Sequence, residues 1–157
     1  MRRVFVLLMI GLVSAGCSVS LGSAETGIRV DTEDFLVEQF EQALPSVETE
    51  VSCSEPELLV VPCRVVVDGQ AVAYEGVVGP DGRVEVWPVG ATVVDGGFIE
   101  RNLATDMPSD ASVACPVVEV VALGEEFRCD LGGSMTGQVA VVFSDPQGTV
   151  ASIELVG

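Results

Sequence analysis

The chain contains two kinds of hydrophobic pattern, which predict helices and strands. Apolar residues between positions 35 and 44 recur every three or four residues, which predicts an amphipathic helix over Asp31 to Leu44. Asp31 or Thr32 is the expected N-cap, and Pro45 ends the helix. The stretches that follow are short, rich in valine and separated by Asp-Gly turn motifs, which predicts antiparallel strands joined by tight hairpins.

This order of elements occurs twice. The helix pattern returns in residues 97–109, and from the second cysteine of each copy onward the two copies align without a gap, with Cys63 on Cys129. The sequence therefore predicts an α+β fold of two tandem repeats, residues 31–90 and 91–157, each with one helix packed on a four-stranded antiparallel sheet. One continuous sheet through both repeats is the alternative. The matching helix positions are Phe35, Leu36, Phe40 and Leu44 in the first copy and Phe98, Ile99, Leu103 and Met107 in the second.

The N-terminus has the pattern of an export signal. Two arginines precede an apolar run, and small residues lead to Cys17, so that Ser14 to Cys17 resembles the lipobox of bacterial lipoproteins. Lipoboxes most often carry leucine where Ser14 stands. We expect removal of residues 1–16, lipidation of Cys17 and a flexible tether over residues 17–30. Ordinary secretion with cleavage after Ala24 is the alternative, and it would remove Cys17.

The four remaining cysteines form two equivalent pairs. Cys53 and Cys63 are ten residues apart, and Cys115 and Cys129 are fourteen apart, each pair at the same place in its repeat. Because export delivers the chain to an oxidising compartment, the sequence predicts one disulfide within each repeat. Closing loops of this size stabilises a fold by roughly 3 kcal/mol in the chain-entropy model.

The charge of the chain limits its partners. Without residues 1–16 it keeps 24 acidic residues and five of the seven arginines, a formal charge of 5 − 24 = −19, and it has no lysine and no histidine. Such a charge repels phosphate, which argues against nucleic acid as a partner and leaves the lipid on Cys17 as the expected membrane attachment. An envelope protein or a cationic partner stays a candidate.

The residue inventory disfavours an enzyme. Without histidine or lysine, no Ser-His-Asp, Cys-His or Ser-Lys arrangement can form, and a zinc site would need four clustered thiolates. The acidic pairs Glu55/Glu57 and Glu125/Glu126 are more typical of solvated loops than of a glycosidase acid and base. We therefore expect no catalytic residue, no metal site and no cofactor.

Two aromatic residues are candidates for a binding face. Tyr74 and Trp87 are the only tyrosine and tryptophan, both fall in the strands of the first repeat, and such side chains are enriched at contact surfaces. The frame that aligns Cys63 with Cys129 sets them on Ala140 and Ile153, which also allows packing inside the protein.

The second repeat resembles a known family. Its cysteine region has a Val-x-Cys-Pro motif, a glycine before the second cysteine and an aromatic two positions before it, which is similar to the DUF4333 domain of actinobacterial lipoproteins. These residues are Val113, Cys115, Pro116, Gly124, Phe127 and Cys129. The first repeat is more divergent, with Ser54 in place of the proline. The resemblance implies a cell-envelope lipoprotein and carries no established activity. The layout of two helix-on-sheet repeats is also similar to the secreted β-lactamase inhibitor proteins of actinobacteria.

The sequence thus predicts an exported, non-enzymatic lipoprotein on the outer face of the cytoplasmic membrane, with a binding or structural role. A secreted or tethered inhibitor of an envelope enzyme is the alternative.

Overall fold

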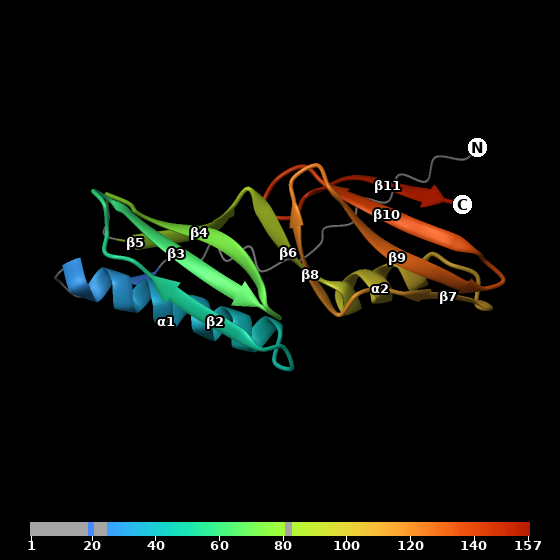
Figure 1. Ribbon diagram of the computed structural model, residues 1–157, viewed down its shortest axis with the longest axis horizontal. Coiled ribbons are helices and arrows are strands. Elements are labelled where there is room, and N and C mark those ends of the chain that lie inside the picture. The colour runs from blue at the N-terminus through green and yellow to red at the C-terminus, as the bar shows by residue number, and fades with distance from the viewer. Residues whose placement is uncertain (1–18, 21–24, 81–82) are drawn as a thin grey trace.

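Two α+β units lie end to end in the protein (Figure 1). The structure is a computed structural model that describes residues 19–20, 25–80 and 83–157. Each unit has one helix packed on a four-stranded antiparallel sheet and one disulfide, which confirms the predicted fold class. The sheets of the two units are separate, so the alternative of one continuous sheet is wrong.

The first unit contains the longer helix. Its sheet has the order β5-β4-β3-β2, and the short strand β1 extends it by pairing Val19 with Val84. Asp68 and Gly69 form the predicted two-residue hairpin turn, both with positive φ, as a type I′ turn requires. The elements are β1 (Val19–Ser20), α1 (Glu25–Ala43), β2 (Thr49–Cys53), β3 (Val60–Val67), β4 (Gln70–Val78) and β5 (Arg83–Val89).

The second unit repeats this arrangement with a shorter helix. Its sheet has the order β11-β10-β9-β7. Asp95 is the N-cap of the helix, and its carboxylate accepts a hydrogen bond from the backbone N–H of Phe98 at 3.1 Å. The elements are α2 (Gly96–Thr105), β7 (Ala111–Ala114), β9 (Glu126–Gly133), β10 (Gly137–Phe143) and β11 (Val150–Val156).

A two-stranded sheet that the hydrophobic pattern did not predict joins the units. It consists of β6 (Ala91–Asp95) and β8 (Val118–Ala122), and β8 lies within the loop that the second disulfide closes. Because neighbouring strand residues point to opposite faces, Val93 packs into the core of the first unit and Val94 into that of the second. This sheet therefore belongs to both cores, and it lies between the units in Figure 1.

The predicted start of the first helix is wrong. Helix α1 begins at Glu25, so the expected N-cap residues Asp31 and Thr32 lie inside it, and residues 25–30 are helix rather than tether. Thr32 is buried, and its hydroxyl donates to the backbone carbonyl of Ile28. Ile28 packs against the core, which gives these earlier residues a tertiary reason to be helical.

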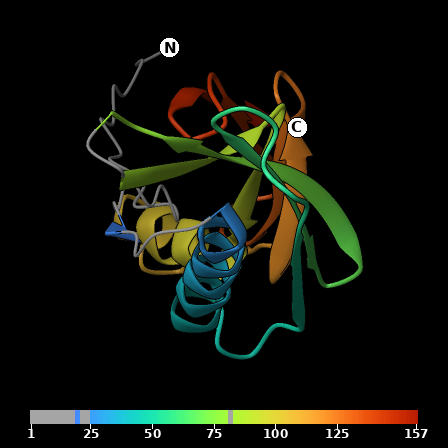
Figure 2. The same ribbon diagram turned by 90° about the vertical axis from the view of Figure 1, so that its left-hand side faces the viewer.

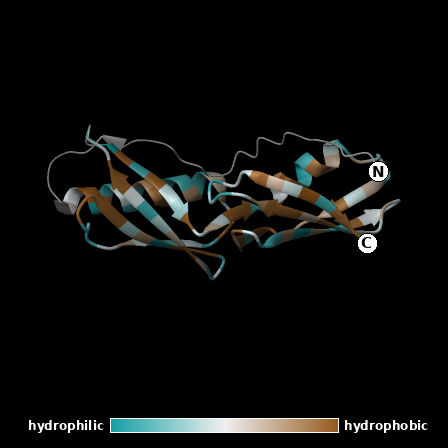
Figure 3. Ribbon diagram, turned by 90° about the horizontal axis from the view of Figure 1, so that it is seen from above, coloured by the Kyte–Doolittle hydropathy of each residue, from teal (hydrophilic) through white to brown (hydrophobic). Residues whose placement is uncertain are grey.

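The core of each unit lies between its helix and its sheet. In the first unit Leu36, Phe40 and Leu44 are buried against alternate residues of β3. In the second unit Ile99 is buried, whereas Leu103 and Met107 are partly buried. Figure 3 shows hydrophobic residues along the strands of both sheets. Among the described residues, no helix is long and apolar enough to cross a membrane.

Candidate functional site

Both predicted disulfides are present. Cys53 and Cys63 are directly opposite each other on β2 and β3, with Cα atoms 4.0 Å apart. Cys115 follows β7 and is bonded to Cys129 of β9, with Cα atoms 4.3 Å apart. Each bond thus links the C-terminal end of the strand that follows the helix to the fourth residue of the neighbouring strand. Two disulfides in one short chain indicate an extracytoplasmic protein.

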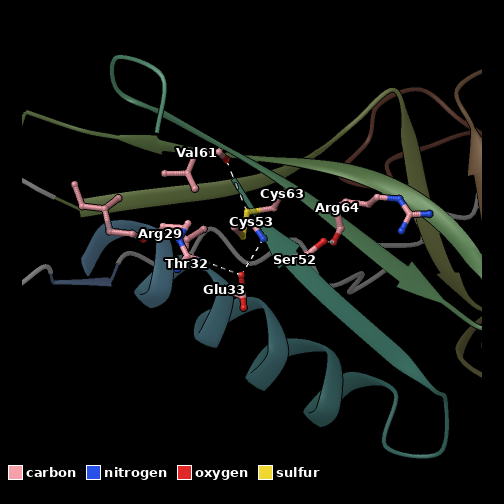
Figure 4. The surroundings of a disulfide bond; sticks show 9 residues. Arg29, Thr32, Glu33, Ser52, Cys53, Val61, Cys63 and Arg64 are labelled. Carbon is pink, nitrogen blue, oxygen red and sulfur yellow. Dashed lines mark hydrogen bonds and ion pairs between the residues drawn. A yellow bond between two sulfur atoms is a disulfide. The ribbon is translucent and has the colours of Figure 1, made fainter. Parts of the chain in front are cut away.

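Each helix is hydrogen-bonded to the first cysteine of its unit. Glu33 of α1 accepts the backbone N–H of Cys53 at 2.9 Å, and Glu100 of α2 accepts that of Cys115 at 3.4 Å (Figure 4 shows the first). Glu33 and Glu100 are not equivalent in the frame that aligns Phe35 with Phe98, so each unit makes this contact from a different helix position. The arrangement fixes the helix relative to the disulfide.

Arg29 adds a charged contact beside the first disulfide. Its Nη1 lies 3.5 Å from Oε2 of Glu33, and its Nε lies 3.3 Å from Oε1 of Glu55, outside hydrogen-bond geometry. Glu55 belongs to the loop that the disulfide closes, so Arg29 links α1 to that loop as well. Both contacts are partly exposed, and each contributes little to stability on its own.

The loop of the first disulfide presents two exposed leucines. Leu58 is fully exposed, at 100 %, and has a φ of 60°, while Leu59 is 61 % exposed. They are the middle residues of a tight turn in which the backbone groups of Glu57 and Val60 bond to each other, N to O at 2.8 and 3.1 Å. A left-handed backbone costs a leucine roughly 1–2 kcal/mol, so the turn is held by its surroundings.

Backbone hydrogen bonds hold this loop to the sheet. Ser54 donates to the carbonyl of Pro62, and Val78 of β4 donates to the carbonyl of Leu59, both at 2.8 Å. Together with the disulfide, these bonds order the loop before any partner is met. An ordered loop with exposed aliphatic side chains loses little entropy when it binds an apolar surface.

The loop of the second disulfide has a different structure. Its strand β8 pairs with β6, and the carbonyl of Val117 accepts the N–H of Gly96 at 3.0 Å. A Cβ at Gly96 would lie 1.6 Å from the carbonyl oxygen of Pro116, so only glycine allows this approach. Val117 of this loop is 74 % exposed. The rest of the loop differs from that of the first unit, because its strand β8 pairs with β6 and joins the two units.

Tyr74 and Trp87, the residues predicted for a binding face, do not share an exposed face. Tyr74 is 4 % exposed in the core of the first unit, edge-to-face with Phe40 at a ring-centroid distance of 5.8 Å. This burial raises the pKa of the Tyr74 phenol. Trp87 is half-buried and pairs with Glu75, the residue after Tyr74, so the two aromatic side chains point to opposite faces of the sheet. Tyr74 is therefore a core residue.

The structure also corrects the alignment of the two repeats. Cys63 pairs with Tyr74, whereas Cys129 pairs with Val139, so Val139 rather than Ala140 is the counterpart of Tyr74. By the same pairing, the counterpart of Trp87 is Glu154 and not Ile153.

Cys17, the predicted lipidation site, lies outside the described residues. Among the described residues, no three side chains of His, Cys, Asp or Glu are grouped closely enough to hold a metal ion.

No known protein family, no curated protein and no solved structure matches this chain. The resemblance of its second unit to the DUF4333 domain stays a prediction.

Proposed function

We propose that the protein is a non-enzymatic lipoprotein, anchored to the outer face of the cytoplasmic membrane through Cys17 and acting as a binding or structural module of the cell envelope. The observation that supports export best is the pair of cross-strand disulfides, one in each unit. The lipobox-like residues Ser14 to Cys17 support the anchor.

The strand pairing of Val19 fits a short link between the anchor and the first unit. Val19, two residues after Cys17, pairs with Val84 at the edge of the first sheet, so the chain between an anchor and the folded unit would be very short. The acidic surface would keep the units away from anionic headgroups. The first unit would then lie next to the membrane and the second would extend into the envelope.

The anchor is tested by the intact mass of the protein extracted from membranes of its own cells. A lipidated chain that begins at Cys17 is expected, and Cys17→Ser should move the protein to the soluble fraction. A mass corresponding to residues 25–157 without lipid would exclude the anchor. A free thiol among the other four cysteines would contradict the disulfides of the exported protein.

A second candidate function is the inhibition of an envelope enzyme by strand addition. Among the described residues, β11 pairs only with β10, and its Ile153 and Leu155 are 37 % and 69 % exposed. An open edge strand of this kind can accept an extended segment of a partner. Purified protein should then inhibit a specific envelope hydrolase, and Leu155→Glu should weaken that inhibition.

A further inference from the structure

Leu58 and Leu59 form an exposed apolar loop tip at the end of the first unit. The loop between β2 and β3 lies at the left end of Figure 1, the end farthest from the second unit, and Figure 2 shows the molecule from that end. A fully exposed leucine in a left-handed turn weakens the fold and contributes no internal packing. A contact outside the chain would explain why such a residue is present.

The same end of the unit holds the start of the described chain. The carbonyl of Leu59 accepts the N–H of Val78, Val78 pairs with Val84, and Val84 pairs with Val19. These four residues form a row across neighbouring strands, which are about 4.8 Å apart, so Leu59 and Val19 lie about 14 Å apart. The leucines and the beginning of β1 are therefore neighbours.

The position of Val19 limits how far Cys17 can be. Two peptide links separate them, so their Cα atoms are at most about 7.6 Å apart whatever the conformation of the link. A lipid on Cys17 would therefore bring the bilayer surface within reach of Leu58 and Leu59. This step rests on the lipid anchor proposed above.

We propose that the Leu58–Leu59 turn inserts into the outer leaflet beside the lipid on Cys17 and that the molecule stands end-on at the membrane. The lipid supplies a high local concentration of bilayer, and the leucines bury apolar surface in it. The turn is already ordered by the Cys53–Cys63 disulfide, so little chain entropy is lost on insertion. Two contacts, instead of one flexible tether, then set the orientation of both units.

Charge restricts the insertion to the tip. Glu55 lies beside Arg29, with the ion pair at 3.3 Å, and Glu57 flanks the turn. The acidic body is repelled by anionic headgroups, so only the turn should enter the bilayer. Phosphatidylcholine vesicles have no net surface charge, so they do not repel the acidic body. They are therefore the appropriate probe for the apolar contact of the turn.

The test replaces the lipid with an artificial tether, so that it does not depend on natural lipidation. Residues 17–157 carrying Cys17→Ser and an N-terminal histidine tag are bound to phosphatidylcholine vesicles that contain a nickel-chelating lipid and a dibrominated lipid. The variant Leu59→Trp is made in a Trp87→Phe background, so that the new tryptophan is the only one. Its fluorescence should shift to the blue and be quenched by the bromine atoms.

Leu155→Trp in the same background is the matched control, because Leu155 is 69 % exposed and lies on the C-terminal strand of the other unit. Its tryptophan should stay unquenched. Adding Leu58→Asn, which suits a left-handed backbone, should remove most of the quenching at position 59 while the circular dichroism spectrum stays native. No quenching at position 59, or equal quenching at positions 59 and 155, would overturn the proposal. The intact mass of the native protein reports on the anchor separately, so failure of the anchor and failure of the insertion are distinguishable.

Discussion

Leu58 combines a left-handed backbone with a fully exposed side chain, and both are unfavourable for a leucine. It has a φ of 60° and is fully exposed, so the fold gains neither a relaxed backbone nor burial from it. We expect Leu58→Asn to increase the free energy of unfolding by about 0.5–1 kcal/mol, because asparagine tolerates the left-handed region far better than leucine. Urea denaturation measures this gain.

The neighbouring leucine provides the control. Leu59 is 61 % exposed but is not among the described residues with a positive φ, so Leu59→Asn should leave stability nearly unchanged. If both substitutions changed stability equally, the effect would come from exposed apolar area and not from the backbone.

Tyr74 makes the stability of the protein depend on pH in the alkaline range. Burial raises its phenol pKa above the ordinary value of about 10, so the folded protein holds the proton more tightly than the unfolded chain does. The contribution of the protonated Tyr74 phenol to stability is then fully present below pH of about 10. It is lost as the pH rises beyond that value, toward the raised pKa of the folded protein.

This pH dependence can be measured directly, because Tyr74 is the only tyrosine. Phenolate absorbance should appear together with the loss of native circular dichroism. The protein is kept at alkaline pH only briefly, so that the disulfides stay intact. Tyr74→Phe should flatten the decline of stability above pH of about 10. Titration of the phenol near its ordinary pKa with the native spectrum retained would contradict the buried position.

Among the elements, each helix is hydrogen-bonded through one glutamate to the first cysteine of its unit. The Glu33 carboxylate accepts the Cys53 N–H at 2.9 Å and lies 3.5 Å from Nη1 of Arg29. We expect Glu33→Ala to cost about 1–2 kcal/mol of stability, since it removes a charge-assisted hydrogen bond and leaves a half-buried N–H unpaired. Thermal unfolding under oxidising conditions measures it.

Glu38 offers a matched position on the same helix. Its carboxylate accepts a hydrogen bond from Gln42, one turn further along the exposed side of α1, at 3.0 Å. Glu38→Ala should therefore cost no more than about 0.5 kcal/mol. A cost for Glu33→Ala no larger than that for Glu38→Ala would show that helix propensity, and not the bond to Cys53, is being measured.

The elements themselves could largely be predicted from the sequence, because their apolar periodicity is strong and is present twice. The start of α1 could not, because Asp31 and Thr32 look like an N-cap whereas the burial of Ile28 that extends the helix is a tertiary contact. Residues 91–95 and 118–122 have no repeat partner whose pattern could have indicated that they pair with each other.

The alignment of the repeats was wrong by one residue for a reason that spacing cannot show. In the first unit the last β3–β4 pair is Val67 and Gln70, which leaves an even number of residues in the loop. In the second unit the last β9–β10 pair is Leu131 and Gly137, which leaves an odd number. The pairing register of the second hairpin is therefore shifted by one residue. The bulge at Val142/Phe143 compensates, so that Val84 and Val150 are equivalent again.

The leucine turn was missed because nothing in the sequence distinguishes it. Leu58 and Leu59 run directly into the valines of β3, and an apolar run of this kind is typical of a buried strand. Their exposure results from the tight bond pattern between Glu57 and Val60, which depends on the disulfide and the sheet around it.

For the whole molecule, the shared sheet of β6 and β8 decides whether the units are independent. Gln70 of the first unit accepts the backbone N–H of Val120 at 3.0 Å. Neither core is complete without this sheet, so the two units should unfold in one transition. Its residues in the first core are Ala91, Val93, Val118 and Val120, and those in the second are Val94 and Val121.

Two observables follow the two units separately. Trp87 fluorescence reports on the first unit, and hydrogen exchange of the β10 amides reports on the second. We expect the free energy of opening from exchange at β10 to equal that from urea denaturation followed by Trp87. Val93→Ala, which removes buried methyl groups from the first core alone, should lower both by about 2 kcal/mol.

The two values would separate if the units were independent. Protection of β10 that outlasts the Trp87 transition, or that is unchanged by Val93→Ala, would mean that the second unit is stable by itself. Coupled unfolding has a consequence for a molecule held at one end, because loosening either unit would then loosen the other. The disulfide of each unit, through the shared sheet, would contribute to the stability of both.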